Sequence, residues 1–228
     1  MITNRQLLLP YAAPYLAYVG LASIPRDYLS AEASYLLRLV IVPLLLVWAW
    51  RWYCSLRGPR SLRGSILVGA GAGLLGLVVW IGLLHPFVTA AEAEPWSTPA
   101  FLLRLVSAGL LVPLFEELMM RGFLFRFALQ WHRAWQNRTV EPLHTALDER
   151  SVNEVEPGAW TWPAVLLSML AFTSGHAPHE WPAAMAYGLL MSLLWIHRQD
   201  LISCVTAHAV TNISLALFIL VTGSWQYW

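Results

Sequence analysis

The stretch that decides the fold class is Leu114–Arg126, which reads LFEELMMRGFLFR. Two adjacent glutamates, Glu116 and Glu117, are followed four residues later by Arg121, and apart from the terminal arginine every other residue is apolar or glycine. Ionisable side chains are costly inside a membrane helix and usually belong to a functional site there. If the surrounding chain is a membrane protein, other polar groups are expected to meet these three.

The composition indicates an integral membrane protein. Of the 228 residues, 58% are hydrophobic and only 12% are charged, whereas a soluble domain is about one quarter charged. The formal net charge of +1 comes with no basic cluster, so nothing predicts a nucleic-acid partner. The two cysteines, Cys54 and Cys204, lack metal or redox spacing and are interpreted as ordinary apolar thiols.

Long apolar runs predict an all-α, polytopic bundle of about seven transmembrane helices, with six to eight possible. The fourth run is long enough to divide or to pass the membrane surface, and the fifth is short. One membrane domain is expected over residues 1–228, with a polar cytoplasmic loop at 130–161. The candidate spans are Leu7–Ile24, Tyr35–Tyr53, Gly64–Leu84, Phe101–Leu129, Trp162–His176, Trp181–His197 and Leu201–Val221.

The distribution of arginines predicts the orientation, because cytoplasmic loops carry an excess of basic residues. Arginines occur in the connections 51–63, 130–161 and 198–200, whereas the 85–100 connection has none. The N-terminus is therefore expected in the cytoplasm and the C-terminus on the opposite side. Arg26, in a connection that should lie outside, is the exception to this pattern.

Helical geometry divides the three charges of the first stretch between two tasks. Glu117 and Arg121 are four residues apart, so they lie on the same face of a helix and can form an ion pair. Glu116 points about 100° away from Glu117. It is therefore left to meet groups from another span.

Two further polar groups lie in apolar spans. FTSGH places Phe172 and His176 on one helical face, and HAVTN does the same for His208 and Asn212. Each alone has an ordinary explanation: an interfacial histidine in the first case and an interhelical hydrogen bond in the second. Dispersed in lipid, all these groups would be costly, so convergence on one cavity is the expected arrangement.

Such a cavity supplies the parts of a hydrolase without a protein nucleophile. Glu116 can act as a general base on a water molecule held between it and His176. His208 and Asn212 can stabilise the oxyanion that forms when this water attacks a peptide carbonyl.

The three motifs also carry a resemblance. EELMMR, FTSGH and HAVTN match the ordered patterns E-E-x-x-x-R, F-x-x-x-H and H-x-x-x-N, and the chain resembles the CAAX prenyl protease and bacteriocin-processing (CPBP) family of intramembrane proteases, in its bacterial prenyl-protease-related branch. The resemblance covers Phe101–Leu217. It implies an endopeptidase of the bacterial inner membrane that cuts a membrane-associated or lipid-modified peptide near the membrane surface.

Carried over residue by residue, the resemblance implies that Glu116 and His176 activate the water while His208 and Asn212 stabilise the oxyanion. It also implies that Glu117, Arg121 and Phe172 support the site. The preferred mechanism uses no cofactor. The alternative is a zinc site, whose ligands would be Glu116, His176 and His208.

Two further alternatives remain at this stage. The chain could be a non-catalytic membrane immunity or peptide-binding protein, for which the complete set of motifs would be unnecessary. A proton relay or transporter is less favoured, since no inverted repeat is visible. Neither the identity of the substrate nor an oligomeric state can be inferred from the sequence.

The predicted spans leave a difference in depth between His176 and Glu116. A helix that begins at Trp162 on the cytoplasmic side and crosses the membrane would carry His176 to the outer end, up to more than ten ångströms from Glu116. Alternatively, this helix ends near the middle of the membrane, as the Ser-Gly and Pro signals allow.

Overall fold

The computed structural model describes residues 2–89 and 94–228, and all regular secondary structure in those residues is helical. This confirms the all-α prediction. Six α-helices of the described residues lie outside the fourth apolar segment and the polar 130–161 loop that follows it. They are α1 (Asn4–Ala22), α2 (Ala31–Ala49), α3 (Leu62–Leu84), α8 (Trp162–Ser174), α9 (Trp181–Arg198) and α10 (Leu201–Thr222). Short 3-10 turns follow or connect them: η1 (Trp50–Trp52), η2 (His85–Phe87), η7 (Pro178–Glu180) and η8 (Trp225–Tyr227).

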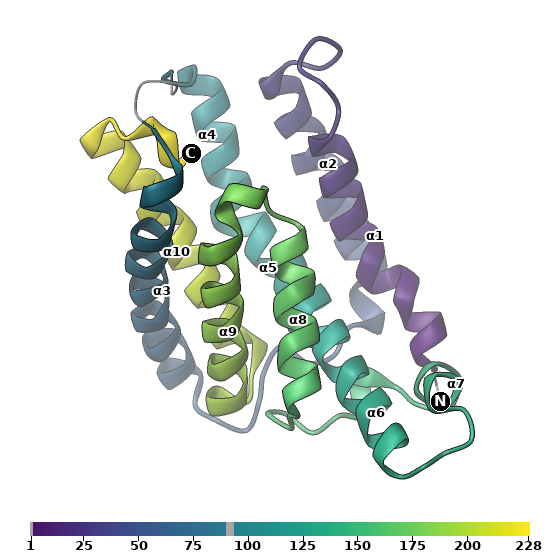
Figure 1. Cartoon of the computed structure of the whole chain (residues 1–228). Helices are drawn as coiled ribbons and strands as arrows, with labels where there is room; N and C mark the ends of the chain where they lie inside the picture. The colour runs from purple at the N-terminus through teal and green to yellow at the C-terminus, as the bar shows by residue number, and fades with distance from the viewer. Residues whose placement is uncertain (1, 90–93) are drawn as a thin grey trace.

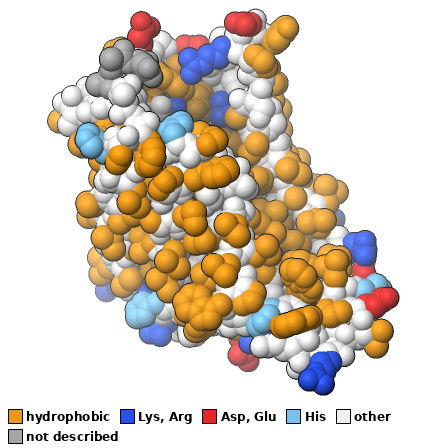
Figure 2. Space-filling view, viewed as in Figure 1, with side chains coloured by type: hydrophobic (Ala, Val, Ile, Leu, Met, Phe, Trp, Pro, Cys, Tyr) orange, Lys and Arg blue, Asp and Glu red, His pale blue; other side chains and the backbone are white. Residues whose placement is uncertain are grey.

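Four helical segments of the described chain are long and apolar enough to cross a membrane: Ala31–Trp52, Leu62–Phe87, Thr98–Gln136 and Leu201–Thr222. The exposed surface agrees with contact with lipid, because large apolar side chains such as Val47, Leu67 and Val78 are more than two-thirds exposed. Figure 2 shows hydrophobic side chains over most of the visible face. The total of six to eight spans stays a prediction.

The two termini lie at opposite ends of the bundle (Figure 1). The N-terminal end of α1 lies beside α7 (Pro142–Asp148). At the other end, Trp225 and Trp228 pack against Phe101 near the start of the fourth segment, with ring centroids 5.7 and 5.3 Å apart. The placement of the termini on opposite sides of a membrane stays a prediction.

The fourth segment is one continuous helix that changes its hydrogen-bonding pattern twice. It consists of α4 (Thr98–Val106), the π-helical η4 (Ser107–Leu111), α5 (Val112–Glu117), the π-helical η5 (Leu118–Leu124) and α6 (Phe125–Gln136). It runs past the predicted end of the span into the polar 130–161 loop, which also contains α7 and η6 (Val152–Glu154). Single π turns inside α-helices frequently mark functional sites, and here they flank the two glutamates.

A buried asparagine fixes the N-terminal helix to this loop. Asn4 is fully buried, and its Nδ2 donates to Gln130 Oε1 at 2.6 Å and to Ala146 O at 2.7 Å. Its Oδ1 accepts from the backbone N–H of Val152 at 2.6 Å. The side chain thus satisfies three polar partners from separate segments, which holds α1 against α6 and α7.

The first helix of the α8–α9 hairpin, which carries the second motif, is short. With 13 residues, α8 is about 20 Å long, shorter than the roughly 30 Å hydrocarbon core. Figure 1 shows the turn between α8 and α9 below the start of α4. The helix ends at Gly175, before the Pro178 turn, as the Ser-Gly and Pro signals allowed, and the depth of His176 in a membrane stays a prediction.

Glycines bring α3 close to α10, the helix that carries the third motif. A Cβ on Gly73 would lie 2.5 Å from Ala207 O, and one on Gly69 would lie 2.6 Å from Ser203 O. Only residues without a side chain permit this approach. It allows Thr211 Oγ1 to donate to Gly73 O at 2.8 Å, which fixes α10 one turn beyond the motif histidine.

Candidate active site

Glu117, Arg121 and His208 form a buried charged cluster. Arg121 Nη1 lies 3.2 Å from Glu117 Oε1, and neither side chain is exposed. This confirms the predicted ion pair. The same carboxylate oxygen lies 3.0 Å from His208 Nδ1, a contact not predicted from sequence. Because an ionised carboxylate only accepts hydrogen bonds, Nδ1 is the nitrogen that carries the hydrogen.

Arg121 also connects this cluster to the α8–α9 hairpin. Its Nη2 donates to the backbone carbonyl of Gly188 in α9 at 3.0 Å. Its Cζ lies 5.6 Å from the centre of the Phe172 ring in α8. A single guanidinium thus contacts both helices of the hairpin, including the one that carries the second motif, and is neutralised by Glu117.

Glu116 faces the other edge of the His208 ring. Its Oε2 lies 3.8 Å from His208 Nε2, and its side chain keeps 15% of its surface accessible, whereas that of Glu117 has none. The distance is too long for a direct hydrogen bond. Glu116 is therefore the partly accessible carboxylate of the pair, next to an imidazole nitrogen that Glu117 leaves free.

Phe172 brings the two motif histidines to one place. Its ring centroid lies 4.6 Å from that of His176 and 6.1 Å from that of His208. His176 Nδ1 is 2.9 Å from Phe172 O, so Nδ1–H donates to this carbonyl and Nε2 keeps the lone pair. Both imidazoles lie close enough to the Glu116 carboxylate to interact with it electrostatically. The structure thus brings Phe172 and the two motif histidines together near Glu116.

Asn212 is held by a carbonyl that the π turn leaves free. In η4 the backbone N–H of Val112 donates to Ser107 O, five residues earlier. The same register would pair Ala108 O with the nitrogen of Pro113, which has no hydrogen. Asn212 Nδ2 donates to Ala108 O at 2.7 Å instead. The amide keeps a second N–H for another acceptor.

Sequence reasoning missed Tyr187, which completes the wall of the site. Its ring centroid is 5.7 Å from that of His208 and 5.9 Å from that of Phe172. Its hydroxyl donates to Thr211 Oγ1 at 3.1 Å, in the helical turn between His208 and Asn212. The sequence feature that could have indicated Tyr187 is a tyrosine in the middle of an apolar span.

The choice between a metal-independent and a zinc mechanism stays a prediction. Within residues 2–89 and 94–228, no three histidine, cysteine or carboxylate side chains are grouped so that they could hold a metal ion. His208 Nδ1 and Glu117 Oε1 already bond to each other, and His176 Nδ1 is bonded to Phe172 O. Both bonds leave the Nε2 atom of each histidine free, so they do not decide between the two mechanisms.

Comparison with known proteins identifies the family. The family model for type II CAAX prenyl endopeptidases, described as Rce1-like, matches residues 98–214, slightly more than half of the chain. The chain belongs to this family. The matched region contains all three motifs, so the resemblance found in the sequence is confirmed, and membership of the family indicates an intramembrane CAAX-type endopeptidase. No curated protein sequence and no solved structure matches the chain.

Proposed function

We propose that this Rce1-like protein hydrolyses a peptide bond of a membrane-associated or lipid-modified protein with a water molecule activated by Glu116. The observation that carries the proposal is the unequal pair of glutamates. Glu117 is fully buried and bound to Arg121 and His208, whereas Glu116 is partly accessible and lies 3.8 Å from His208 Nε2. Of the two, Glu116 is the carboxylate that is free to take a proton from water.

In the first step, Glu116 removes a proton from water while the water oxygen attacks the carbonyl carbon of the substrate. His176 Nε2, which carries a lone pair because Nδ1–H is bonded to Phe172 O, accepts a hydrogen bond from the second water hydrogen and orients the attack. A new C–O bond forms, and the carbonyl π electrons move to the oxygen. The product of this step is a tetrahedral oxyanion.

His208 and Asn212 stabilise that oxyanion in the proposed mechanism. His208 donates from Nε2–H as an imidazolium, whose charge is stabilised by the Glu117 carboxylate on Nδ1. Asn212 donates its second amide N–H, since the first is bonded to Ala108 O. The C–N bond then breaks, and the proton held by Glu116 passes to the leaving amine.

Mass spectrometry of cells tests the proposed activity and identifies the substrate in the same experiment. Membrane peptides are compared between cells producing the wild-type protein, Glu116→Gln, or the control Glu156→Gln, which changes an exposed carboxylate. New peptide termini are expected with the wild type and the control and not with Glu116→Gln. Identical termini in all three would refute the proposed catalytic role of Glu116.

We further propose that the protein lies in the bacterial inner membrane with its N-terminus in the cytoplasm. Thr89 and Asn137 are exposed at opposite ends of the bundle, and both native cysteines are buried. A membrane-impermeant maleimide is expected to label Thr89→Cys in intact cells and Asn137→Cys only after permeabilisation. The opposite pattern would invert the proposed orientation.

A further inference from the structure

The first helix presents three tyrosines to the segment that carries the two glutamates. Tyr11, Tyr15 and Tyr18 are spaced by four and three residues, so they share one face of α1. Tyr11 packs against Phe123, with ring centroids 5.3 Å apart. Tyr15 and Tyr18 pack against Phe115, with ring centroids 6.1 and 4.9 Å away. The tyrosine face thus lies against the fourth segment on both sides of the two glutamates.

The hydroxyls at the two ends of this face have partners. Tyr11 Oη donates to Asn153 Oδ1 at 3.1 Å and accepts from the backbone N–H of Cys54 at 2.7 Å. Tyr18 Oη accepts from Ser107 Oγ at 3.1 Å. These two hydroxyls therefore hold α1 against its neighbours and have structural roles.

The hydroxyl of Tyr15, between them, has no such partner. Within residues 2–89 and 94–228, no group hydrogen-bonds to it, and it is not among the polar atoms that are buried without a partner. A hydroxyl offers one donor and two acceptor sites, and burying them unpaired is costly. Tyr15 is only partly buried, so its hydroxyl is open to a group that the protein itself does not supply.

This open hydroxyl lies next to the first and second motifs. A Cβ on Gly175 would lie 2.5 Å from Tyr15 Oη, so α1 and the end of α8 approach here only because position 175 has no side chain. Gly175 directly precedes His176. The hydroxyl also lies close enough to the Glu116 carboxylate to interact with it electrostatically. Tyr15 thus brings a polar group to the site from outside the matched region 98–214.

The turn of α1 that carries Tyr15 is fixed without help from this hydroxyl. Pro14 has no N–H, so the carbonyl of Pro10, four residues earlier, lacks its helical partner. Tyr53 Oη donates to Pro10 O at 3.0 Å instead. The Tyr53 ring also packs on that of Tyr11, with centroids 4.9 Å apart. Removing the Tyr15 hydroxyl should therefore leave α1 in place.

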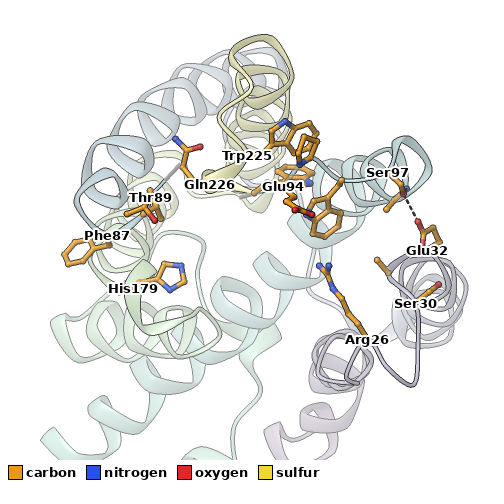
Figure 3. A pocket seen from close by; sticks show the side chains of 16 residues that line it. Arg26, Ser30, Glu32, Phe87, Thr89, Glu94, Ser97, His179, Trp225 and Gln226 are labelled. Atoms are coloured by element: carbon orange, nitrogen blue, oxygen red, sulfur yellow. Dashed lines mark hydrogen bonds between the residues drawn. The ribbon is translucent and has the colours of Figure 1, made fainter. Parts of the chain in front are cut away.

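The same two elements form walls of a large cavity. It has a volume of about 1170 Å³ and opens at the end of the bundle that holds the C-terminus. Figure 3 shows Arg26, in the connection after α1, and His179, in η7, on different walls of this cavity. Tyr15 and Gly175 precede these residues on the two walls, so a peptide that enters from the cavity moves toward Tyr15 and Glu116.

We propose that Tyr15 is a further catalytic residue, whose hydroxyl binds the amide nitrogen of the peptide bond that is cut. This inference rests on the proposed peptidase function. In the tetrahedral intermediate, the nitrogen keeps its N–H and gains a lone pair. The N–H donates to Tyr15 Oη, and the Tyr15 O–H donates to the carboxyl group of Glu116.

This arrangement places the nitrogen where the proton held by Glu116 can reach it. The C–N bond breaks as that proton moves to the lone pair of the nitrogen, while Tyr15 neither gains nor loses a proton. Hydrogen bonds of this kind commonly tighten only when the substrate is bound. Tyr15 therefore acts on the departure of the amine, whereas His208 and Asn212 act on the oxyanion.

Two matched substrates separate this role from a structural one. The full-length protein in lipid vesicles is given a synthetic ten-residue peptide that spans the cleavage site found in cells, or its ester analogue. In the ester, an oxygen replaces the N–H of the bond that is cut, so nothing can donate to Tyr15. An alkoxide also leaves with less help from a proton than an amide nitrogen does. Cleavage is counted above the rate with Glu116→Gln.

Tyr15→Phe keeps the ring and removes only the hydroxyl. It is expected to lower kcat/KM for the peptide by about 10- to 100-fold and to change that for the ester by no more than about threefold. Its unfolding midpoint should equal that of the wild type, because no partner loses a hydrogen bond. The control Tyr18→Phe removes the hydroxyl that is bonded to Ser107. It should lower the unfolding midpoint and keep the wild-type ratio of peptide to ester cleavage.

Gly175 provides a second way to displace the same hydroxyl. A Cβ at this position would lie 2.5 Å from Tyr15 Oη but 3.8 Å from Tyr15 Cζ, so alanine collides with tyrosine and fits against phenylalanine. Gly175→Ala should slow peptide cleavage as Tyr15→Phe does, and the double variant should be no slower than Tyr15→Phe alone. Losses that multiply in the double variant would contradict the contact on which the inference rests.

The remaining outcomes decide between the inference and the proposed function. Equal cleavage of the peptide by wild type and Tyr15→Phe would overturn the inference. An equal loss on peptide and ester, which is what a structural role produces, would overturn it as well. A wild-type protein that cleaves neither substrate faster than Glu116→Gln would overturn the proposed peptidase function instead.

Discussion

Replacing Glu117 with glutamine tests how the buried cluster supports the site. Glutamine keeps the shape and can still accept from His208 Nδ1, but it removes the charge that faces Arg121. At 3.2 Å, with an effective dielectric constant of about 20, the lost attraction is roughly 5 kcal/mol. Removing one partner of a buried pair typically costs about 3–5 kcal/mol. We expect the free energy of unfolding to fall by that amount.

The double variant Glu117→Gln, Arg121→Met separates stability from chemistry. With both charges gone, no guanidinium is left buried without a partner in this cluster, so most of the lost stability should return. Peptide cleavage should stay low, because no carboxylate is left to accept from His208 Nδ1 and stabilise the imidazolium that donates to the oxyanion. Unfolding followed by tryptophan fluorescence and cleavage are measured on the same samples, with Glu156→Gln as the exposed control. A single variant as stable as this control, or a double variant with wild-type cleavage, would refute the reasoning.

Three further predictions concern packing, the N-terminal attachment and metal. Gly73→Val places a Cβ 2.5 Å from Ala207 O and should lower the free energy of unfolding by about 1–3 kcal/mol. The control Gly71→Val, whose Cβ meets nothing within 4 Å, should be nearly neutral in the same unfolding assay. Asn4→Ala leaves three partners without Asn4, two of them buried, and should cost about 3 kcal/mol. An unfolding midpoint equal to the wild type would contradict the role of Asn4. Cleavage should survive exhaustive chelation, and one zinc ion per chain in the active protein, measured by elemental analysis, would contradict the metal-independent mechanism.

Local geometry allowed part of the site to be predicted from the sequence. The Glu117–Arg121 pair follows from a spacing of four residues and is present even though η5 departs from α-helical hydrogen bonding. The all-helical class followed equally directly from the long apolar runs. The division of Glu116 from Glu117 could also be predicted, since adjacent helical residues point in different directions.

Contacts across the fold could not be predicted in the same way. The Glu117–His208 bond joins residues 91 positions apart, and Asn212 bonds to Ala108 only because a π turn precedes Pro113. Arg38 is buried, although it lies near the start of a predicted span, where an arginine is ordinarily interfacial. Its burial depends on how α1 and α2 pack, which no periodicity indicates.

The central claim, that Glu116 activates the water, is tested most directly by the cleavage rate of purified Glu116→Gln. The protein is reconstituted in lipid vesicles, with the peptide found in the cellular experiment as substrate. Loss of a general base should lower the rate by about 10²- to 10⁴-fold, while the unfolding midpoint stays at the wild-type value. Cleavage by Glu116→Gln at the wild-type rate would contradict the claim, as would a stable, inactive Glu117→Gln beside an active Glu116→Gln.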